Sequence, residues 1–248
     1  VAFTMAPAPP VYNAHYPVHS RVEVDAGGTR RTAHPILVVE AKLPEPYRAP
    51  VTSPWAPVAV APDARLALAR LPAVRAAVQV FGEPARAQPA GWEGADPTTR
   101  AHVRWRGFAD RGGGREAVVL HPPWFAGKAG TVWAEFPLRL PAGGPLRLTF
   151  ANAIRDHHPE GGEPPSDGVT FRVRIIPADA PDGALGEVLF ERHTASNTWV
   201  EGSADLSAFA GRTVRLQLES HPGQKQDTTC DESYWADPVL TSGTPPAP

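Results

Sequence analysis

The sequence lacks several features that define large classes of protein. Cys230 is the only cysteine among 248 residues, so no internal disulfide forms, and a chain with 42% hydrophobic residues has a core large enough to need none. A run of about 18 apolar residues, the minimum for a membrane-spanning helix, is absent. The formal net charge is only -2, so no overall field attracts the chain to nucleic acid or to an anionic membrane.

Sequence motifs of several enzyme classes are also missing. There is no G-x-S-x-G, no H-E-x-x-H and no phosphate-binding loop, and no pair of carboxylates is marked out by its spacing. Cys230 lies among carboxylates, which raise the pKa of a thiol, whereas a catalytic thiol needs a lowered pKa. We therefore expect a protein that is not an enzyme, with a glycoside hydrolase or lyase as the least favoured alternative.

What the sequence does contain favours an all-β fold. The 30 prolines and 22 glycines break helices and occupy turns and edge strands. Apolar residues alternate with polar ones over 146–150, 169–175 and 214–218, as in strands with one buried and one wet face. In the second of these segments Phe171 is expected to face the core. Such strands, separated by turn signals, predict an antiparallel β-sandwich or jelly roll.

The expected organisation has four parts. Residues 1–20 form an extended proline-rich arm, residues 21–100 add strands or a small β unit, residues 101–241 form the sandwich, and residues 242–248 are a tail.

Within the second part, residues 36–43 are a strand by composition, and the period-two alternation over 64–83 predicts two more. The chain begins Val-Ala-Phe without an initiator methionine, which predicts a processed chain and favours an extracellular or cell-surface location.

Several phrases of the chain resemble a known type of domain. The succession HPPW, LTFANAIRD, SDGVTFRVRI, DLSAFAGRTVRLQLES and YWADPVL, over about residues 117–241, is similar to the jelly-roll carbohydrate-binding modules of bacterial secreted and surface proteins. The resemblance implies a β-sandwich that binds carbohydrate without catalysis, and such modules often carry a structural calcium ion. The phrases themselves are turns and core positions, so they indicate the fold more strongly than the ligand.

Candidate ligand-binding residues lie in loops and at strand ends. Sugars are recognised by aromatic faces together with polar groups for the hydroxyls, and the loops at one end of a sandwich are common binding sites. The expected ligand-binding residues are Trp124, His157, His158, Trp199, Tyr234 and Trp235. For each tryptophan the core is the commoner environment, and of Tyr234 and Trp235 one is expected to anchor in the core. The two adjacent histidines belong to a solvated loop more often than to a metal site.

A cluster of carboxylates near the C-terminus is the candidate metal site. The expected calcium ligands are Asp227, Asp231, Glu232 and Asp237, which lie within eleven positions of one another. Calcium takes about 6–8 oxygen ligands, and carboxylates crowded in one loop repel each other unless a cation or backbone N–H groups neutralise them. The alternative is a polar loop in which the aspartates cap turns.

Two functions of different classes therefore remain open. The first is an extracellular carbohydrate-binding module. The second is a structural subunit that binds copies of itself, with its N-terminal arm adding a strand to a neighbour's sheet in a filament or surface layer. Neither function needs nucleic acid or membrane insertion.

Overall fold

The computed structural model describes residues 3–5, 22–26, 29–33, 56–71 and 74–243 of the chain. The chain forms two compact units, Val1–Thr52 and Ser53–Pro248. In the first unit three antiparallel strands pair in the order β1 (Phe3–Met5), β2 (Val22–Ala26) and β3 (Thr29–Ala33). The strand expected at 36–43 lies outside the described residues.

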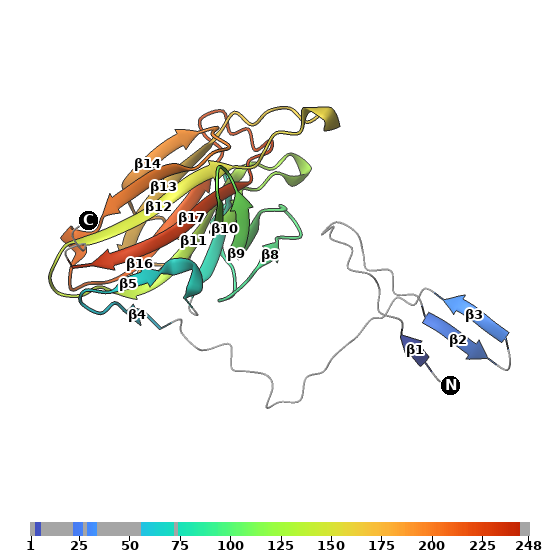
Figure 1. Cartoon of the computed structure of the whole chain (residues 1–248), viewed down its shortest axis with the longest axis horizontal. Coiled ribbons are helices and arrows are strands. Elements are labelled where there is room, and N and C mark those ends of the chain that lie inside the picture. The colour runs from blue at the N-terminus through green and yellow to red at the C-terminus, as the bar shows by residue number, and fades with distance from the viewer. Residues whose placement is uncertain (1–2, 6–21, 27–28, 34–55, 72–73, 244–248) are drawn as a thin grey trace. The chain divides into compact units, whose positions relative to one another are not determined.

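The second unit is a sandwich of two sheets (Figure 1). The sheet named here the β17 sheet has the order β15 (Val200–Asp205), β12 (Leu146–Ile154), β17 (Ser233–Ser242), β10 (Gly114–His121), β9 (His102–Asp110) and β8 (Gly94–Ala95), with β5 (Arg65–Ala67) also paired to β17. Its described pairings are all antiparallel.

The other sheet, named the β16 sheet, has the order β14 (Glu187–Thr194), β13 (Val169–Pro177), β16 (Thr213–His221), β11 (Gly130–Arg139), β6 (Arg75–Val80) and β7 (Arg86–Ala87). A short strand, β4 (Val58–Ala59), pairs parallel with β11, and the other pairings are antiparallel. The predicted all-β antiparallel sandwich is thus confirmed.

The core lies between the two sheets, and the period-two pattern fixes which side chains enter it. Val169, Phe171, Val173 and Ile175 of β13 are all buried, so the predicted register of this strand is confirmed. Across the core, Trp235 of β17 packs between Phe150 and Phe171, with ring centroids 5.0 and 5.2 Å away. Burying an aliphatic or aromatic side chain contributes roughly 1.5–3 kcal/mol, so this face is the main source of stability.

The sandwich begins earlier in the chain than residue 101. The two strands expected over 64–83 occur as β5 and β6, with the 3-10 turn η2 (Leu68–Arg70) following β5, and they join different sheets. Strands β4 to β8 therefore belong to the sandwich unit and not to a separate β unit.

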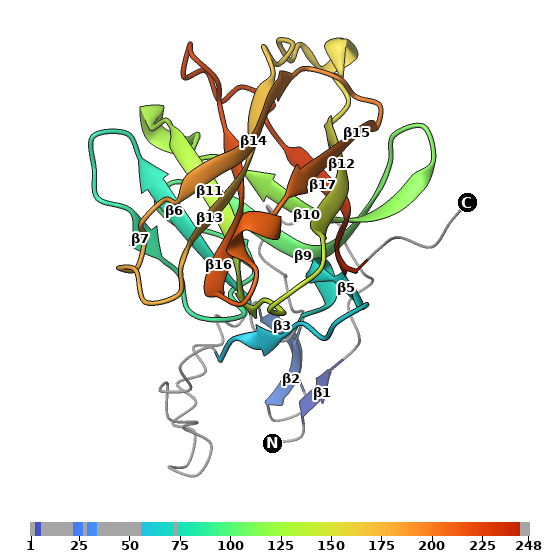
Figure 2. The same cartoon turned by 90° about the vertical axis from the view of Figure 1, so that its left-hand side faces the viewer.

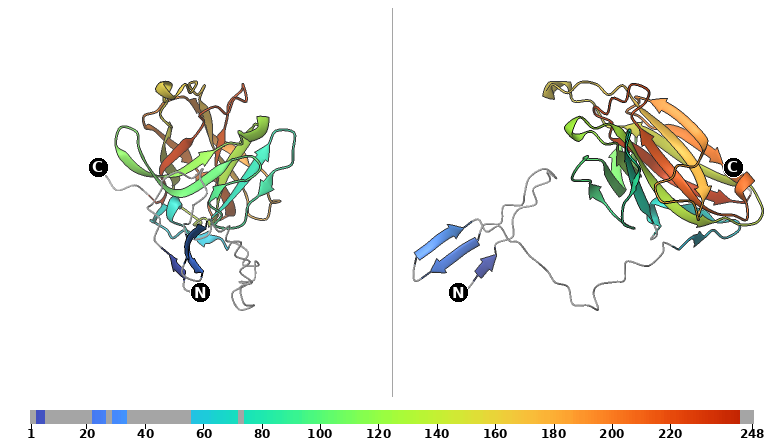
Figure 3. Two further views of the ribbon diagram at one scale, coloured as in Figure 1. Left: turned by 90° about the vertical axis from the view of Figure 1, so that its right-hand side faces the viewer. Right: turned by 180° about the vertical axis from the view of Figure 1, so that it is seen from behind.

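The long connections after β10, β12 and β16 emerge at the same end of the sandwich, at the top of Figure 2 and of both panels of Figure 3. They contain the 3-10 turns η3 (Phe125–Gly127) and η4 (Pro159–Gly161); a further turn, η5 (Ser207–Phe209), precedes β16. Within the described residues, no helix has the length and apolar character needed to cross a bilayer.

Candidate functional site

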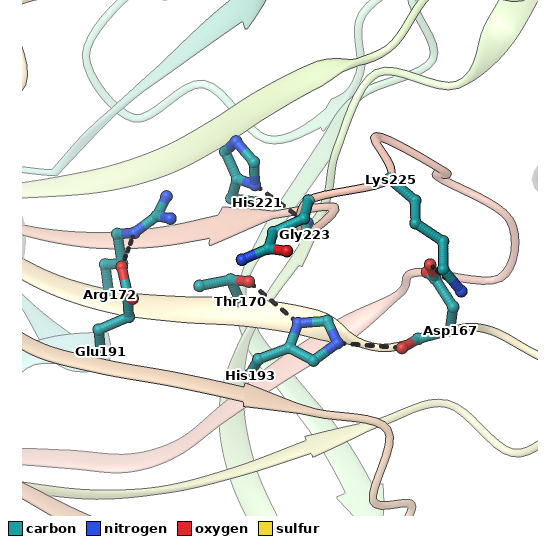
Figure 4. Close-up of a pocket in the computed structure, with 9 residues that line it drawn as sticks. Asp167, Thr170, Arg172, Glu191, His193, His221, Gly223 and Lys225 are labelled. Atoms are coloured by element: carbon teal, nitrogen blue, oxygen red, sulfur yellow. Dashed lines mark hydrogen bonds and ion pairs between the residues drawn. The ribbon is translucent and has the colours of Figure 1, made fainter.

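An open pocket of about 440 Å³ lies on the outer face of the β16 sheet at this loop end (Figure 4). Strands β13, β14 and β16, the end of the loop before β13 and the loop after β16 supply its lining. The lining residues are Asp167, Thr170, Arg172, Glu191, His193, His221, Gly223, Gln224 and Lys225. Polar and charged side chains dominate, and the volume falls in the range of about 300–1,000 Å³ that is usual for ligand sites.

Strand register brings these residues together although they span almost sixty positions of the sequence. Thr170 is the register partner of His193 on one side and of His221 on the other. Two residues further along the same face, Arg172 is the partner of Glu191 and of Glu219. Because alternate residues of a strand face the same way, three neighbouring strands place their polar positions in one patch.

His193 is held in a fixed position within the pocket (Figure 4). A Cβ at Gly168 would lie 2.8 Å from its Nε2, and a Cβ at Gly223 would lie 2.9 Å from its Cε1, so both glycines give room to the ring. The Asp167 carbonyl, 3.0 Å from Nε2, only accepts, so in the neutral ring Nε2–H donates to it. The Thr170 hydroxyl then donates to Nδ1, also at 3.0 Å.

Two ion pairs flank this histidine. The Arg172 guanidinium donates to Glu191 at 2.5 Å and to the buried Glu219 at 3.4 Å. The Lys225 ammonium lies 3.4 Å from the Asp167 carboxylate. The hydrogen bond from Arg172 lowers the pKa of Glu191, and burial, aided by the positive charge of Arg172, lowers the pKa of His221. At neutral pH Glu191 is therefore ionised and His221 is neutral.

This arrangement suits binding better than acid catalysis. A general acid for glycoside hydrolysis needs a carboxyl group whose pKa is raised. Glu191 has a lowered pKa, and both carboxylates of the lining already face a cation. The pocket instead places hydrogen-bond donors beside acceptors.

The outer face of the β17 sheet is closed by the chain itself. A register irregularity between Ala117 and Val119 lets the β9–β10 hairpin bend, and its tip contacts Trp199, which precedes the edge strand β15. The Arg111 and Gly113 carbonyls accept hydrogen bonds from the backbone and indole N–H groups of Trp199, at 2.9 and 2.6 Å. The buried residues that pack together here, from the hairpin itself and from β12 and β17, are mostly small: Ala109, Ala117, Val119, Ala151, Ala153, Tyr234 and Ala236.

Tyr234 and Trp199, both expected to bind ligand, belong to this covered cluster. Their rings meet edge to face with centroids 6.3 Å apart, and the Arg111 guanidinium lies over the Tyr234 ring. Burial and the neighbouring Glu232 raise the pKa of Tyr234 to about 12. Tyr234 is buried and Trp199 is half-buried, so neither ring presents a free face of the kind that stacks on a sugar.

The other expected ligand-binding residues have three different environments. Trp235 is fully buried in the core, which corrects its assignment to a ligand site; its indole N–H donates to Ser220. Trp124 is 43% exposed beside the equally exposed Phe125, and the two rings meet edge to face. This pair is the exposed aromatic feature of the loop end, in the loop that Pro122 and Pro123 stiffen.

His157 and His158 lie in the exposed loop between β12 and β13, as expected. The His157 ring is 2.6 Å from the Glu163 carbonyl, and the His158 ring is 3.2 Å from the Glu160 carboxylate. His157 lines a cavity of about 260 Å³ that Cys230 also lines. Burial and the nearby Glu163 carboxylate raise the pKa of the Cys230 thiol, as expected for an unreactive cysteine.

The four carboxylates expected to bind calcium do not converge. Asp227 caps its own turn by accepting a hydrogen bond from the Thr229 N–H. Glu232 contacts His102 and Tyr234. Asp237 is exposed, and its carboxylate lies 4.0 Å from the Arg115 guanidinium. Asp231 is fully buried and accepts a hydrogen bond from Ser166, but its second oxygen has no partner.

In the described part of the chain no three His, Cys, Asp or Glu side chains are grouped to hold a metal ion. The residues present therefore do not fit a calcium site built from all four carboxylates. Of these four carboxylates, Asp231 is the one with a buried oxygen that has no partner and that a cation would satisfy.

Sequence reasoning missed most of the pocket in Figure 4. The period-two pattern predicts that Thr170 and Arg172 lie on the outer, wet face of β13; both line the pocket on that face, where Arg172 is half-buried and Thr170 is buried. Nothing in the sequence pairs them with β14 or with residues 221–225. The one available signal was the glycine in each flanking loop, Gly168 and Gly223, both at positive φ.

Comparisons with known proteins give distant likenesses. No family model matches the chain. A curated protein of Archaeoglobus fulgidus, described as uncharacterized, is 29% identical over 96 residues, which cover 38% of this chain and 23% of that protein. The match thus spans less than a quarter of that relative's length.

Among solved structures, the K1 cleaved adhesin domain of Lys-gingipain from Porphyromonas gingivalis is similar with a TM-score of 0.41 and 13% identity, covering 73% of this chain and 98% of that one. The C-terminal family 22 carbohydrate-binding module of Clostridium thermocellum Xyn10B has a TM-score of 0.37 and 12% identity, covering 61% and 86%. A family 61 carbohydrate-binding module in complex with β-1,4-galactotriose has a TM-score of 0.33 and 16% identity, covering 51% and 70%.

Proposed function

We propose that the sandwich unit is a carbohydrate-binding module without catalytic activity, that it acts outside the cell, and that its ligand occupies the pocket of Figure 4. The observation that carries the proposal is the lining of this pocket. Guanidinium and ammonium donors lie there beside carboxylate acceptors, on the face of a sheet and open to solvent. Hydroxyl groups donate and accept at one atom, so a sugar satisfies both kinds of partner at once.

The sequence supports the same proposal. The phrases over 117–241 resemble jelly-roll carbohydrate-binding modules, and the strands they predict are the strands of the sandwich. Trp124 supplies an exposed aromatic face at the same end of the sandwich, where a pyranose ring can stack. Hydrolysis is not part of the proposal, because Glu191 is held ionised by Arg172.

The alternative function, assembly through an N-terminal arm, stays a prediction. Most of residues 1–20 lies outside the described residues, and nothing in the described part of the sandwich favours a filament over a binding module.

Calorimetric titration with oligosaccharides tests the proposed function. We expect Lys225→Ala to weaken binding by about tenfold, because a hydrogen bond to a charged group contributes about 1.5–3 kcal/mol. Arg70→Ala is the matched control, since Arg70 also pairs with a carboxylate, Glu116, but lies on η2 outside the pocket lining. Absence of binding to every glycan tested, by a folded protein, would falsify the proposal.

A third variant separates the pocket from the aromatic pair. If Trp124→Ala abolishes binding while Lys225→Ala has no effect, the sugar lies on the Trp124 loop and the pocket is not the site. If both variants weaken binding, the ligand extends over both features.

A further inference from the structure

The charges that line the pocket of Figure 4 are balanced within it. Arg172 and Lys225 supply two cations, and Glu191 and Asp167 supply two carboxylates. Each cation faces one of these carboxylates, Arg172 at 2.5 Å and Lys225 at 3.4 Å. The pocket therefore holds no cation whose charge is left for the ligand to neutralise.

Residues below the pocket do not alter this balance. Glu219 is buried and lies between two arginines, 3.4 Å from Arg172 and 2.6 Å from Arg174. Arg174 also donates to the Gly186 carbonyl at 2.9 Å. His221 adds no positive charge at neutral pH, because burial lowers its pKa.

We infer that the pocket selects neutral glycans with free neighbouring hydroxyls and rejects uronate and sulfated sugars. This inference rests on the proposed function and names the class of ligand for the same site. An ion pair presents a donor and an acceptor side by side, which matches two adjacent hydroxyls of a sugar. Glu191 and Asp167 would repel a ligand carboxylate or sulfate, because all of these groups are negatively charged. Such a ligand could form an ion pair with Arg172 only by displacing Glu191.

The inference identifies Glu191 as the residue that sets specificity. Its carboxylate is 55% exposed and can accept a hydrogen bond from a ligand hydroxyl while it stays paired with Arg172. Glu191→Gln keeps the shape of the side chain but removes the carboxylate nearest to Arg172, so that only the buried Glu219, 3.4 Å away, still faces this guanidinium. The variant is therefore expected to lose affinity for neutral sugars and to gain affinity for anionic ones.

Parallel titrations with neutral and anionic oligosaccharides test the inference. The probes are cello-, xylo- and galacto-oligosaccharides on one side and oligogalacturonate and a sulfated galactan oligosaccharide on the other. We expect the wild-type protein to prefer the best neutral probe by at least about tenfold, and Glu191→Gln to reduce that ratio by about tenfold. Glu116→Gln, which removes a carboxylate from the remote pair with Arg70, should leave the ratio unchanged.

A second measurement does not depend on any variant. Binding of a neutral sugar should change little between about 0.05 and 0.5 M salt, whereas binding of an anion to cations weakens with salt because surface charges are screened. Equal or tighter binding of the anionic probes by the wild-type protein, with strong salt dependence, overturns the inference and leaves carbohydrate binding intact. A folded protein that binds none of the probes overturns the proposed function itself.

Discussion

The outer faces of the two sheets are built in opposite ways. On the β16 sheet the outer face is charged, and Glu135, Arg215 and Glu219 are almost completely buried there. On the β17 sheet the outer face is lined mainly by alanines, together with Tyr234. Both faces are covered by the chain: residues 178–186 lie over the first, and the β9–β10 hairpin lies over the second.

The difference shows that the cover determines which side chains each face requires. Residues 178–186 bring backbone carbonyls, and two of these accept hydrogen bonds from Arg215, at 2.7 and 3.0 Å. Gln217 likewise donates to the Ala184 carbonyl at 2.8 Å, so polar side chains find acceptors beneath this segment. The β9–β10 hairpin brings a second layer of backbone close to the sheet, and only small side chains leave room for it.

The largest expected effect is on the charged face. Glu135 accepts from Arg75, Gln217 and the Trp133 indole, and Arg215 lies 3.7 Å away. Arg75 and Arg215 both contact Glu135 and Asp182, and Glu135→Gln removes the buried one of these two carboxylates. We expect it to lower the free energy of unfolding by about 3–5 kcal/mol, measured by urea titration.

The control for this variant is an ion pair on the other face. Glu201 is 69% exposed and lies 2.7 Å from Arg115. Glu201→Gln should cost less than about 1 kcal/mol, because exposed pairs contribute little. Equal losses at the two positions would mean that solvent reaches the charged face and that the comparison between the two faces does not hold.

The sequence predicted the strands but not the segments that pack over their outer faces. Alternation in "VTFRVRII" placed Phe171 in the core and Arg172 outside, and the structure agrees. The same alternation in β16 predicts a wet face for Arg215 and Glu219, which are instead buried. Alternation reports only which face of a sheet a side chain occupies, so it cannot report that a distant loop folds over that face.

The next effect concerns the loop that joins the two sheets, between β16 and β17. Burial raises the pKa of Asp231 to about 8, so the folded protein keeps this proton at neutral pH, while the unfolded chain loses it near the ordinary aspartate pKa of 3.8. Unfolding then releases a proton between about pH 4 and pH 8, and stability falls as pH rises through this window. Asp231→Asn should remove the dependence and raise stability at pH 8 by a few kcal/mol, on the scale of about 1.4 kcal/mol per pKa unit.

Thermal melts from pH 5 to pH 8.5, in the presence of a chelator, measure this effect. Asp227→Asn is the control in the same loop, because Asp227 is exposed and its pKa is lowered by the Thr229 hydrogen bonds. A wild-type midpoint that does not fall between pH 5 and pH 8.5 would show that Asp231 is ionised in the fold.

Calcium, predicted from the sequence, can be tested at the same residue. A bound cation would favour the ionised Asp231 and satisfy its unpartnered oxygen. Calcium should then raise the melting midpoint of the wild-type protein at pH 8 and leave that of Asp231→Asn unchanged. If neither calcium nor chelator moves the wild-type midpoint, calcium is not a ligand of this loop.

A smaller effect is expected on the alanine-lined outer face of the β17 sheet. Ala236 is fully buried between β10 and β12 on the outer face of the β17 sheet. Ala236→Leu has no room beneath the β9–β10 hairpin and should cost about 1–3 kcal/mol. Ala208→Leu, at an exposed position of η5, should change stability by less than about 0.5 kcal/mol. A neutral Ala236→Leu would show that the hairpin is not closely packed on the sheet.

The smallest effect is expected at Cys230, which belongs to neither outer face. Its thiol lies 3.8 Å from the Arg155 guanidinium and 3.9 Å from the Glu163 carboxylate, both distances typical of weak contacts of sulfur. Its raised pKa keeps it a thiol at neutral pH, and serine matches its size and its capacity to donate. Cys230→Ser should therefore change the free energy of unfolding by less than about 0.5 kcal/mol and leave glycan affinity as it is. Loss of an activity in this variant would instead assign the thiol a chemical role, and the non-catalytic function proposed above would then be wrong.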